Sequence, residues 1–333
     1  MTLAKVARRA RVSSATVSRA LNNASTVKGS TRARVMRAAK ELNYHPNLHA
    51  RSLARGSSRT LGIILSNMEN PFFFDIFQVL ESCARERGYE AVVANTSYRS
   101  EQLVASVRLM LGLRVAGLAA VVSEMDADLI RTINDSRTPC VFYDVGKPGR
   151  NVTNVRVDYR KGTEKTVEYL HALGHNRIAF IGHHASLGPI NERRTAFLAA
   201  VSRFAPRTQT KLTEGTDSPE GGRQAARELF SSGFRPTAIV CVNDFMAVGV
   251  LRELRAQGIR VPQEVSVTGF DNIRLSEFCS PPLTTVHIPR EHIGHTIFEH
   301  LLPDPKRPRP KGREIMIDTE LVVRESTGTP PRA

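Results

Sequence analysis

Residues 12–22 of the 333-residue chain read VSSATVSRALN, and this stretch decides the fold of the N-terminal part. Ser13 can cap a helix that carries its apolar residues on one face, and Thr2 can cap an earlier helix of the same kind. The apolar positions are Leu3, Val6, Ala7 and Ala10 in the first helix and Val17, Ala20 and Leu21 in the second. Two short helices joined by a tight turn at Arg11 and Val12 predict a helix-turn-helix.

A third helix is predicted from Thr31 after a polar loop over residues 22–30. Its apolar stripe consists of Val35, Ala38, Ala39 and Leu42. Leu42 and Tyr44 would close a small core before Pro46 ends the helical pattern. The sequence therefore predicts an all-α helix-turn-helix domain over residues 1–46.

Positive charge is concentrated in the same region. The chain has 47 Lys or Arg residues against 32 acidic ones, a net charge of +15. Residues 1–59 hold thirteen of these basic residues and one acidic residue, Glu41, and so carry +12 of that charge. A compact basic head is typical of a protein that binds nucleic acid or an anionic membrane surface. A disordered basic tail is the plainer alternative, but such a tail has no reason to repeat helix caps and apolar stripes.

The outward side of the second helix carries the predicted DNA contacts. In a helix-turn-helix this helix enters the major groove with its N-terminal residues towards the base edges. Arg19 can make the bidentate contact that guanine favours, and the nearby hydroxyls can donate hydrogen bonds to phosphates. One such Ser is usually only a cap and one such Arg only a solvated charge, so the prediction depends on the whole set. The predicted DNA-contacting residues of the head are Thr2, Ser13, Ser14, Ala15, Thr16, Ser18, Arg19 and Asn22.

A short helical segment is predicted within residues 47–59. Leu48, Ala50 and Leu53 recur along about two turns, and Gly56 can end them. A helix this short is unstable alone in water, so we expect it to fold only on binding. A plain interdomain linker is the alternative, although a linker needs no such apolar spacing.

These stretches resemble the LacI/GalR family of bacterial transcription regulators. The resemblance is carried by Val6-Ala7, by the run of residues 12–22 and by LNYHPN at residues 42–47, and it continues through nearly the whole chain. Two departures are Arg11, where the family often has a turn glycine, and Lys5, where it often has an acid. A positive φ at Arg11 would carry some strain.

The resemblance implies roles for particular residues. Ser14, Ala15 and Arg19 would read a half-site of the operator. Ala50 and Leu53 would lie on a hinge helix, with Leu53 wedged into the minor groove at the operator centre, where such wedges kink DNA.

From residue 60 onwards, short apolar runs alternate with amphipathic segments. Predicted strands cover residues 61–65, 91–94, 117–122, 140–143, 178–181, 238–242 and 265–269, with a further strand near Ile315. Predicted helices cover residues 73–87, 102–111, 162–173, 196–204, 222–230 and 246–257. Continuous apolar strands with crossover helices indicate parallel sheets covered on both faces. Residues 60–333 are thus predicted to form two doubly wound α/β lobes with a cleft between them.

The family's core resembles periplasmic sugar-binding proteins, and this likeness implies interleaved lobes. The chain would cross between the lobes near Asp158, Pro289 and Asp318. The same resemblance implies that the core binds an effector and pairs with a second copy to form a homodimer.

Polar and aromatic residues follow the predicted strands, where open α/β sheets bind their ligands. They are Phe72, Phe73, Asp144, Asn243 and Asp271, with Arg193 placed at the start of the helix after the 178–181 strand. Such side chains suit a sugar or polyol, because they offer hydrogen bonds and an aromatic cover for the ring. In the family, the positions of Asp144, Arg193, Asn243 and Asp271 often contact the effector. The three acidic or amide residues among them could instead be turn or helix caps, and we interpret Asp244 as a cap.

One departure bears on the effector. Where the family often places an aromatic residue against the ligand, this chain has Asp217, which cannot stack on a ring. Residues 183–189 lack the polar groups of purine-responsive relatives, and a phosphorylated ligand finds no obvious cation beyond Arg193. A small neutral sugar or polyol is therefore predicted, with a purine, a phosphorylated sugar or no effector at all (a constitutive repressor) as alternatives.

Other classes of function are disfavoured. The sequence lacks nucleotide-binding and hydrolase motifs, so no catalytic site and no cofactor are predicted. His292, His295 and Glu299 share a helix face, but Ile293, Ile297 and Leu301 define its buried side, so no metal site is predicted. The longest uncharged apolar run, at residues 115–122, is too short to cross a bilayer, and the N-terminus shows no signal peptide.

The four cysteines form no CxxC pair, so we expect reduced thiols packed as small hydrophobes in a cytoplasmic protein. A transport-type binding protein would need an export signal and no DNA-binding head. The sequence therefore predicts a dimeric repressor that binds a near-palindromic DNA operator under effector control.

Overall fold

The computed structural model describes residues 2–22, 24–44, 58–124, 126–183, 186–302 and 312–331. The chain separates into two compact units, Met1–Ser58 and Arg59–Ala333. We call the described residues of the first unit the head and those of the second the core.

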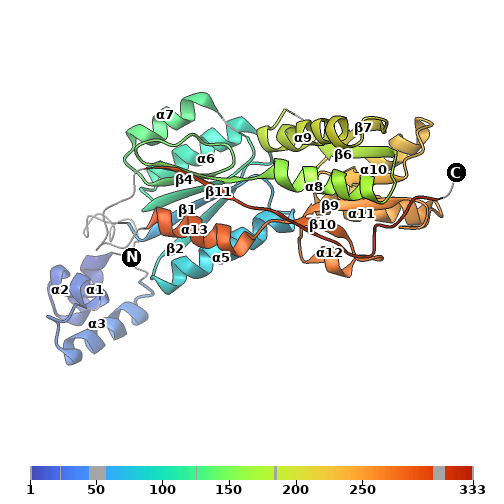
Figure 1. Ribbon diagram of the computed structural model, residues 1–333. Helices are drawn as coiled ribbons and strands as arrows, with labels where there is room; N and C mark the ends of the chain where they lie inside the picture. Colours follow the sequence, from blue (N-terminus) through green and yellow to red (C-terminus); the bar gives the residue numbers. More distant parts are fainter. Residues whose placement is uncertain are drawn as a thin grey trace. The chain divides into compact units, whose positions relative to one another are not determined.

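The head contains three helices around a small apolar centre (Figure 1). They are α1 (Leu3–Ala10), α2 (Ser14–Leu21) and α3 (Gly29–Glu41). The apolar positions buried at their centre are Val6, Ala7, Ala10, Val17, Ala20, Val35, Ala38 and Ala39. The predicted helix-turn-helix and its third supporting helix are confirmed.

Local detail in the head agrees with most of the sequence signals. The Ser13 hydroxyl accepts a hydrogen bond from the Thr16 N–H at 3.1 Å, which is the predicted cap of α2. Thr2 stands at the N-cap position of α1, but its side chain makes no capping hydrogen bond. Arg11 has φ = 52°, a left-handed conformation that costs a non-glycine residue about 1–2 kcal/mol. Helix α3 begins before the predicted Thr31, because the Lys28 carbonyl already accepts from the Arg32 N–H.

Lobe 1 of the core is built on a six-stranded sheet with the order β11-β5-β4-β3-β1-β2, in which all neighbours run parallel. Helices α5 and α13 cover one face, and α6 and α7 cover the other (Figure 1). The strands are β1 (Thr60–Leu65), β2 (Glu90–Asn95), β3 (Gly117–Val121), β4 (Cys140–Tyr143), β5 (Val152–Val157) and β11 (Glu314–Ile317). The helices are α5 (Pro71–Glu86), α6 (Ser100–Gly112), α7 (Ala127–Asp135) and α13 (Arg290–Leu301).

Lobe 2 has a second six-stranded sheet with the order β12-β10-β9-β8-β6-β7, in which β12 alone runs antiparallel to its neighbour. The strands are β6 (Arg177–His183), β7 (Gln209–Gly215), β8 (Ala238–Cys241), β9 (Ser266–Asp271), β10 (Thr284–His287) and β12 (Glu320–Val322). Helix α8 packs on α9, and α10 packs on α11. The helices are α8 (Tyr159–Ala172), α9 (Gly188–Phe204), α10 (Pro219–Ser231), α11 (Asp244–Ala256) and the short α12 (Leu275–Phe278).

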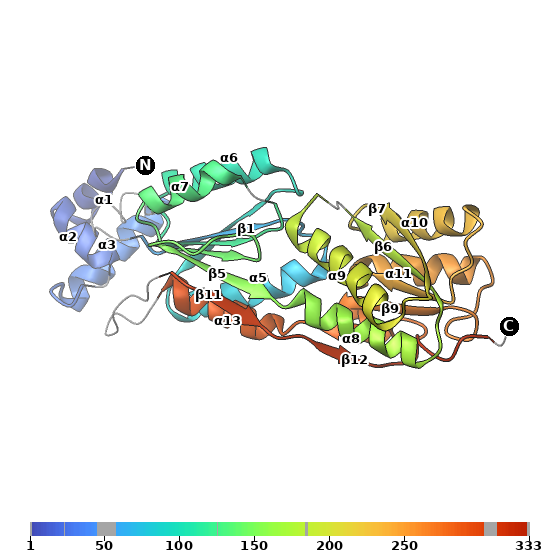
Figure 2. The same ribbon diagram turned by 45° about the horizontal axis from the view of Figure 1, so that its top comes forward.

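The chain passes between the lobes three times. It leaves lobe 1 after β5 at Asp158, returns after β10 through Pro289, and leaves again between β11 and β12 at Asp318. In Figure 2 the last passage runs between the red strands β11 and β12, which belong to different sheets. These crossings lie where the sequence predicts them, and the two-lobed, doubly wound α/β core is confirmed.

The structure adds to the predicted elements and moves some of their ends. Strands β5, β7, β10 and β12 are absent from the prediction, because they are short or rich in polar residues. Helix α9 starts at Gly188, well before the predicted residue 196. Arg193 therefore lies inside this helix and does not begin it.

Three of the cysteines, Cys83, Cys140 and Cys241, are buried, whereas Cys279 is half-buried. Ile293, Ile297 and Leu301 form the buried side of α13, as predicted. Within the described residues, no helix is both long and apolar enough to span a membrane.

Candidate functional site

The head presents most of its predicted DNA contacts at the surface. Thr2, Ser13, Ser14, Ala15 and Arg19 are exposed, whereas Thr16, Ser18 and Asn22 are half-buried. The predicted contacts of the second helix come from its N-terminal end and its outward face. The two hinge residues of the prediction, Ala50 and Leu53, lie outside the described residues.

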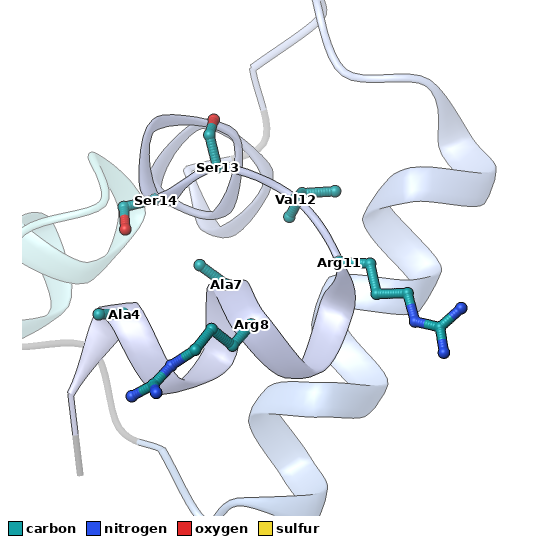
Figure 3. A pocket seen from close by; sticks show the side chains of 7 residues that line it. All are labelled: Ala4, Ala7, Arg8, Arg11, Val12, Ser13 and Ser14. Carbon is teal, nitrogen blue, oxygen red and sulfur yellow. The ribbon is translucent and has the colours of Figure 1, made fainter.

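An open hollow of about 550 Å³ lies beside the N-terminus of α2 (Figure 3). It is lined by Ala4, Ala7, Arg8, Arg11, Val12, Ser13 and Ser14. The N-terminus of a helix attracts anions through its unpaired N–H groups and its dipole. Arg8 and Arg11 also line this hollow and add positive charge to it, although neither is among the predicted DNA-contacting residues.

In the core, Asp144 follows β4 with φ = 67° and points back into lobe 1. Its carboxylate accepts hydrogen bonds from the Tyr159 hydroxyl and, at 2.9 Å, from the Val157 N–H. Burial raises the pKa of Asp144 to about 6, and the hydrogen bond from Tyr159 opposes that rise. Asp144 is thus a half-buried acid, and each of its two carboxylate oxygens accepts one hydrogen bond from the protein.

Arg193 is the buried cation of the same region. Its guanidinium lies over the rings of Tyr159 and Phe270, 4.5 Å and 5.2 Å from their centroids. It donates to the Val242 carbonyl at 2.7 Å, and its Nη1 lies 3.8 Å from the Asp271 carboxylate. The position inside α9 therefore brings Arg193 to the ends of β8 and β9.

Asp271 ends β9 with φ = 106°. Burial holds the pKa of its carboxyl well above the usual range, and the nearby Arg193 opposes this shift. The Arg290 guanidinium donates to the Asp271 carbonyl and forms a 3.0 Å ion pair with Asp75 of α5. This Arg290 pairing links lobe 1 to the end of β9.

Phe72 and Phe73 begin α5 and are almost fully buried. Their rings meet edge to face at 5.4 Å. Phe72 also packs on Tyr143 at 5.8 Å, and Phe73 on Tyr98 at 6.4 Å. Both rings therefore pack in the core of lobe 1, near the end of β1.

Asn243, and not Asp244, is the N-cap of α11. Asn243 caps α11 by accepting from the Met246 N–H at 2.9 Å, and its amide N–H donates to Asp217 at 2.7 Å. The interpretation of Asp244 as the cap is wrong. Asp244 instead accepts hydrogen bonds from the Ile273 N–H at 2.8 Å and the Thr285 hydroxyl at 2.5 Å. Burial raises its pKa to about 7.

The predicted residues fall into two neighbouring groups. Asp144, Arg193 and Asp271 share one group, held together by Tyr159. Asn243 belongs to a second group around Asp217, which the sequence marks only as a departure from the family. Tyr98, Asn67, Asn70 and His183 complete that group, and local sequence pattern contains no signal for them because they come from separate strands and loops.

Comparisons with known proteins agree with both units. Residues 2–47 match the family described as bacterial regulatory proteins, lacI family, and residues 167–327 match a periplasmic binding protein-like domain. The repressor PurR of Erwinia tasmaniensis is 34% identical over 99% of this chain and 98% of its own length.

Two solved structures are similar over nearly the whole chain. The Lac repressor dimer bound to operator and the anti-inducer ONPF has a TM-score of 0.80 and 31% identity, over 98% of this chain and 99% of that one. The regulator CelR in complex with cellobiose has a TM-score of 0.70 and 28% identity over the same shares. The relatives are regulators of transcription and not enzymes, as the sequence predicts. With a repressor of this similarity over its full length, the chain belongs to the LacI family of bacterial regulatory proteins.

Proposed function

We propose that the chain represses transcription as a homodimer whose affinity for a near-palindromic operator is set by a small sugar or polyol. The head, residues 1–46, would bind one half-site, residues 47–59 would form the hinge, and residues 60–333 would bind the effector and pair with a second copy. Such a regulator would work in the cytoplasm, at the nucleoid.

The observation that carries the effector assignment is the group of Asp144, Arg193 and Asp271. The half-buried Asp144 and the buried Asp271 and Arg193 lie near strand ends of the two lobes, beside the ring faces of Tyr159 and Phe270. Hydroxyl groups of a sugar can donate to carboxylates and accept from a guanidinium, and apolar ring faces suit aromatic cover. An anionic phosphate would face two acids here, which disfavours a phosphorylated ligand.

Two further observations support a homodimer. Large apolar side chains are exposed on α5 and α12: Phe74 is 40% exposed, Leu275 46% and Phe278 73%. Exposed apolar residues mark a protein interface where they form one contiguous patch. The similar Lac repressor was solved as a dimer.

The test is fluorescence anisotropy on a library of palindromic duplexes, repeated with neutral sugars, polyols, purines and phosphorylated sugars. We expect one duplex family to bind specifically and one neutral sugar or polyol to strengthen or release it. A response to a purine or a sugar phosphate alone would replace the proposed effector class. Specific binding that no ligand changes would favour a constitutive repressor, and binding without sequence preference would contradict the proposed function.

A further inference from the structure

Asp217 lies in the loop between β7 and α10 of lobe 2, and it faces lobe 1. It is 5% exposed, and both of its carboxylate oxygens are in use. Three donors come from lobe 1: the side-chain amides of Asn67 and Asn70, at 3.0 Å and 3.2 Å, and the Tyr98 hydroxyl. The Asn67 amide also donates to the Asp217 carbonyl at 3.2 Å.

Two residues of lobe 2 also contact the Asp217 carboxylate. The Asn243 amide donates to it at 2.7 Å, and the His183 Nε2 lies 3.7 Å away. Although burial raises the pKa of Asp217, His183 and the hydrogen bonds outweigh it and leave that pKa below the usual value. The carboxylate is therefore ionised and is shared between the two lobes.

Tyr98 reaches Asp217 from a strained loop. Ser97 and Tyr98 have φ values of 51° and 60°, an unusual pair for two consecutive residues that are not glycine. Such strain is costly and persists only where surrounding contacts impose it.

The contacts that impose this strain are visible at the end of β2. The Thr96 N–H donates to the Leu65 carbonyl at 2.9 Å, and the Thr96 hydroxyl donates to the buried Glu124. The Tyr98 ring packs on His183 of lobe 2 and on Phe73, with 5.5 Å and 6.4 Å between the ring centroids. The loop thus directs an aromatic ring of lobe 1 against lobe 2.

We propose that Asp217 is the centre of a clasp that holds the two lobes closed on one another in the absence of any ligand. Tyr98, Asn67 and Asn70 are the lobe 1 half of this clasp, and Asp217, Asn243 and His183 are the lobe 2 half. The side chains of the protein itself would then keep the two lobes closed.

The clasp also selects among ligands, a consequence that rests on the proposed effector site. A ligand that enters beside Asp217 displaces lobe 1 donors, and the buried carboxylate must receive replacements because an unpaired buried charge is costly. Ligands with hydroxyl or ammonium donors satisfy this requirement, whereas anions do not. Asp217 is therefore a specificity-determining residue of the lobe boundary.

The test measures the distance between the lobes in the full-length protein without DNA or ligand. Spin labels are placed on cysteines that replace Arg108 in α6 and Glu228 in α10, two exposed positions, with the half-buried Cys279 changed to Ser. Labelled protein is diluted with unlabelled protein so that pulsed electron paramagnetic resonance reports distances within one chain.

We expect one narrow distance distribution in the otherwise unchanged protein and a broader one, with a longer component, in Asp217→Asn. Tyr98→Phe removes the hydroxyl that donates to the charged Asp217 and should lower the ratio of closed to open molecules by about tenfold. Glu214→Gln is the matched control, since it removes an exposed acid three residues from Asp217 and should leave the distribution unchanged.

The clasp is rejected if the parent protein already gives a broad distance distribution or if Asp217→Asn keeps a narrow one. It is also rejected if Glu214→Gln broadens the distribution as much as Asp217→Asn does. Circular dichroism melts of each variant confirm that the lobes remain folded. Because neither operator nor effector is present, a failure here leaves the proposed function standing, and a failure of operator binding leaves the clasp standing.

Discussion

The head and the core use charge in opposite ways. The head exposes its cations, among them Arg8, Arg11 and Arg19, on a small helical unit. The core instead places its own groups against some of its acids: Asp144 accepts hydrogen bonds from Val157 and Tyr159, and Asp271 lies beside Arg193. The exposed cations of the head are therefore available to phosphates of a DNA partner, whereas these acids of the core pair with groups of the core itself. Substitutions in the head should change operator affinity with little effect on the free energy of unfolding. Substitution of buried acids in the core should change the free energy of unfolding or the effect of the effector on operator affinity.

The response to salt should differ strongly between the head and the core. If each dimer makes about 6–10 phosphate contacts, operator affinity should fall roughly 10³–10⁵-fold between 50 and 200 mM salt. The free energy of unfolding of the core should change little over the same range, because its exposed ion pairs contribute little to stability and salt screens its buried ones only weakly. Anisotropy titrations and urea unfolding at matched salt concentrations measure both, and a flat affinity would remove the phosphate-binding role of the head.

Arg19→Ala tests direct reading of bases. We expect a loss of about 1–3 kcal/mol per half-site and a relaxed preference at one base position, because a bidentate contact to guanine is removed. Arg37→Ala is the control, since it removes an exposed cation from α3 with the same change of charge. Equal weakening of all duplexes by Arg19→Ala would show that this side chain contacts phosphate only.

The pH dependence of stability tests the buried acids. The pKa of Asp244 is raised to about 7 in the folded protein, so the folded state holds this proton more tightly than the unfolded state. The corresponding stability is present below about pH 4 and is lost as the pH rises to 7. Asp244→Asn cannot ionise, so at pH 8 it should be more stable than the parent by an amount on the order of 4 kcal/mol.

Urea unfolding at pH 4 and pH 8 measures this difference. At pH 4 the parent and Asp244→Asn should unfold at similar urea concentrations. Asp135→Asn, at an exposed site in α7, should show no gain at either pH. A gain that is equal at both pH values would mean that ionisation of Asp244 is not its cause.

Asp271→Asn tests the coupling between the units. The variant keeps the size and left-handed backbone of Asp271 but replaces the carboxyl group beside Arg193 with an amide. We expect operator affinity without effector to remain and the 5–150-fold effector response, about 1–3 kcal/mol of coupling, to disappear. An unchanged response in effector titrations would place the effector away from Asp271.

The head could be predicted from sequence because its signals are local. The cap at Ser13 and the apolar positions of each helix lie within one or two turns of the residues that they position. The start of α3 was displaced because a main-chain carbonyl, at Lys28, provides the first hydrogen bond, and any residue can supply one.

The core could be predicted only in outline. Strands with continuous apolar residues were found, whereas β7, with Lys211 and Glu214 in a sheet edge, reads as a loop. The residues after the strand ends could be identified, but their partners could not. Asp217 meets Tyr98 across 119 positions of the chain, and that meeting depends on the register of both sheets and on a strained loop.

The three passages between the lobes have a consequence for synthesis on the ribosome. Lobe 1 lacks α13 and β11 until the chain beyond residue 317 has emerged, and lobe 2 still needs β12 after that. Neither lobe is a contiguous stretch that could be completed first, so both sheets must wait for the last part of the message. A premature stop codon after residue 288 would therefore damage both halves at once, and exchange of a single contiguous gene segment cannot transplant either lobe whole.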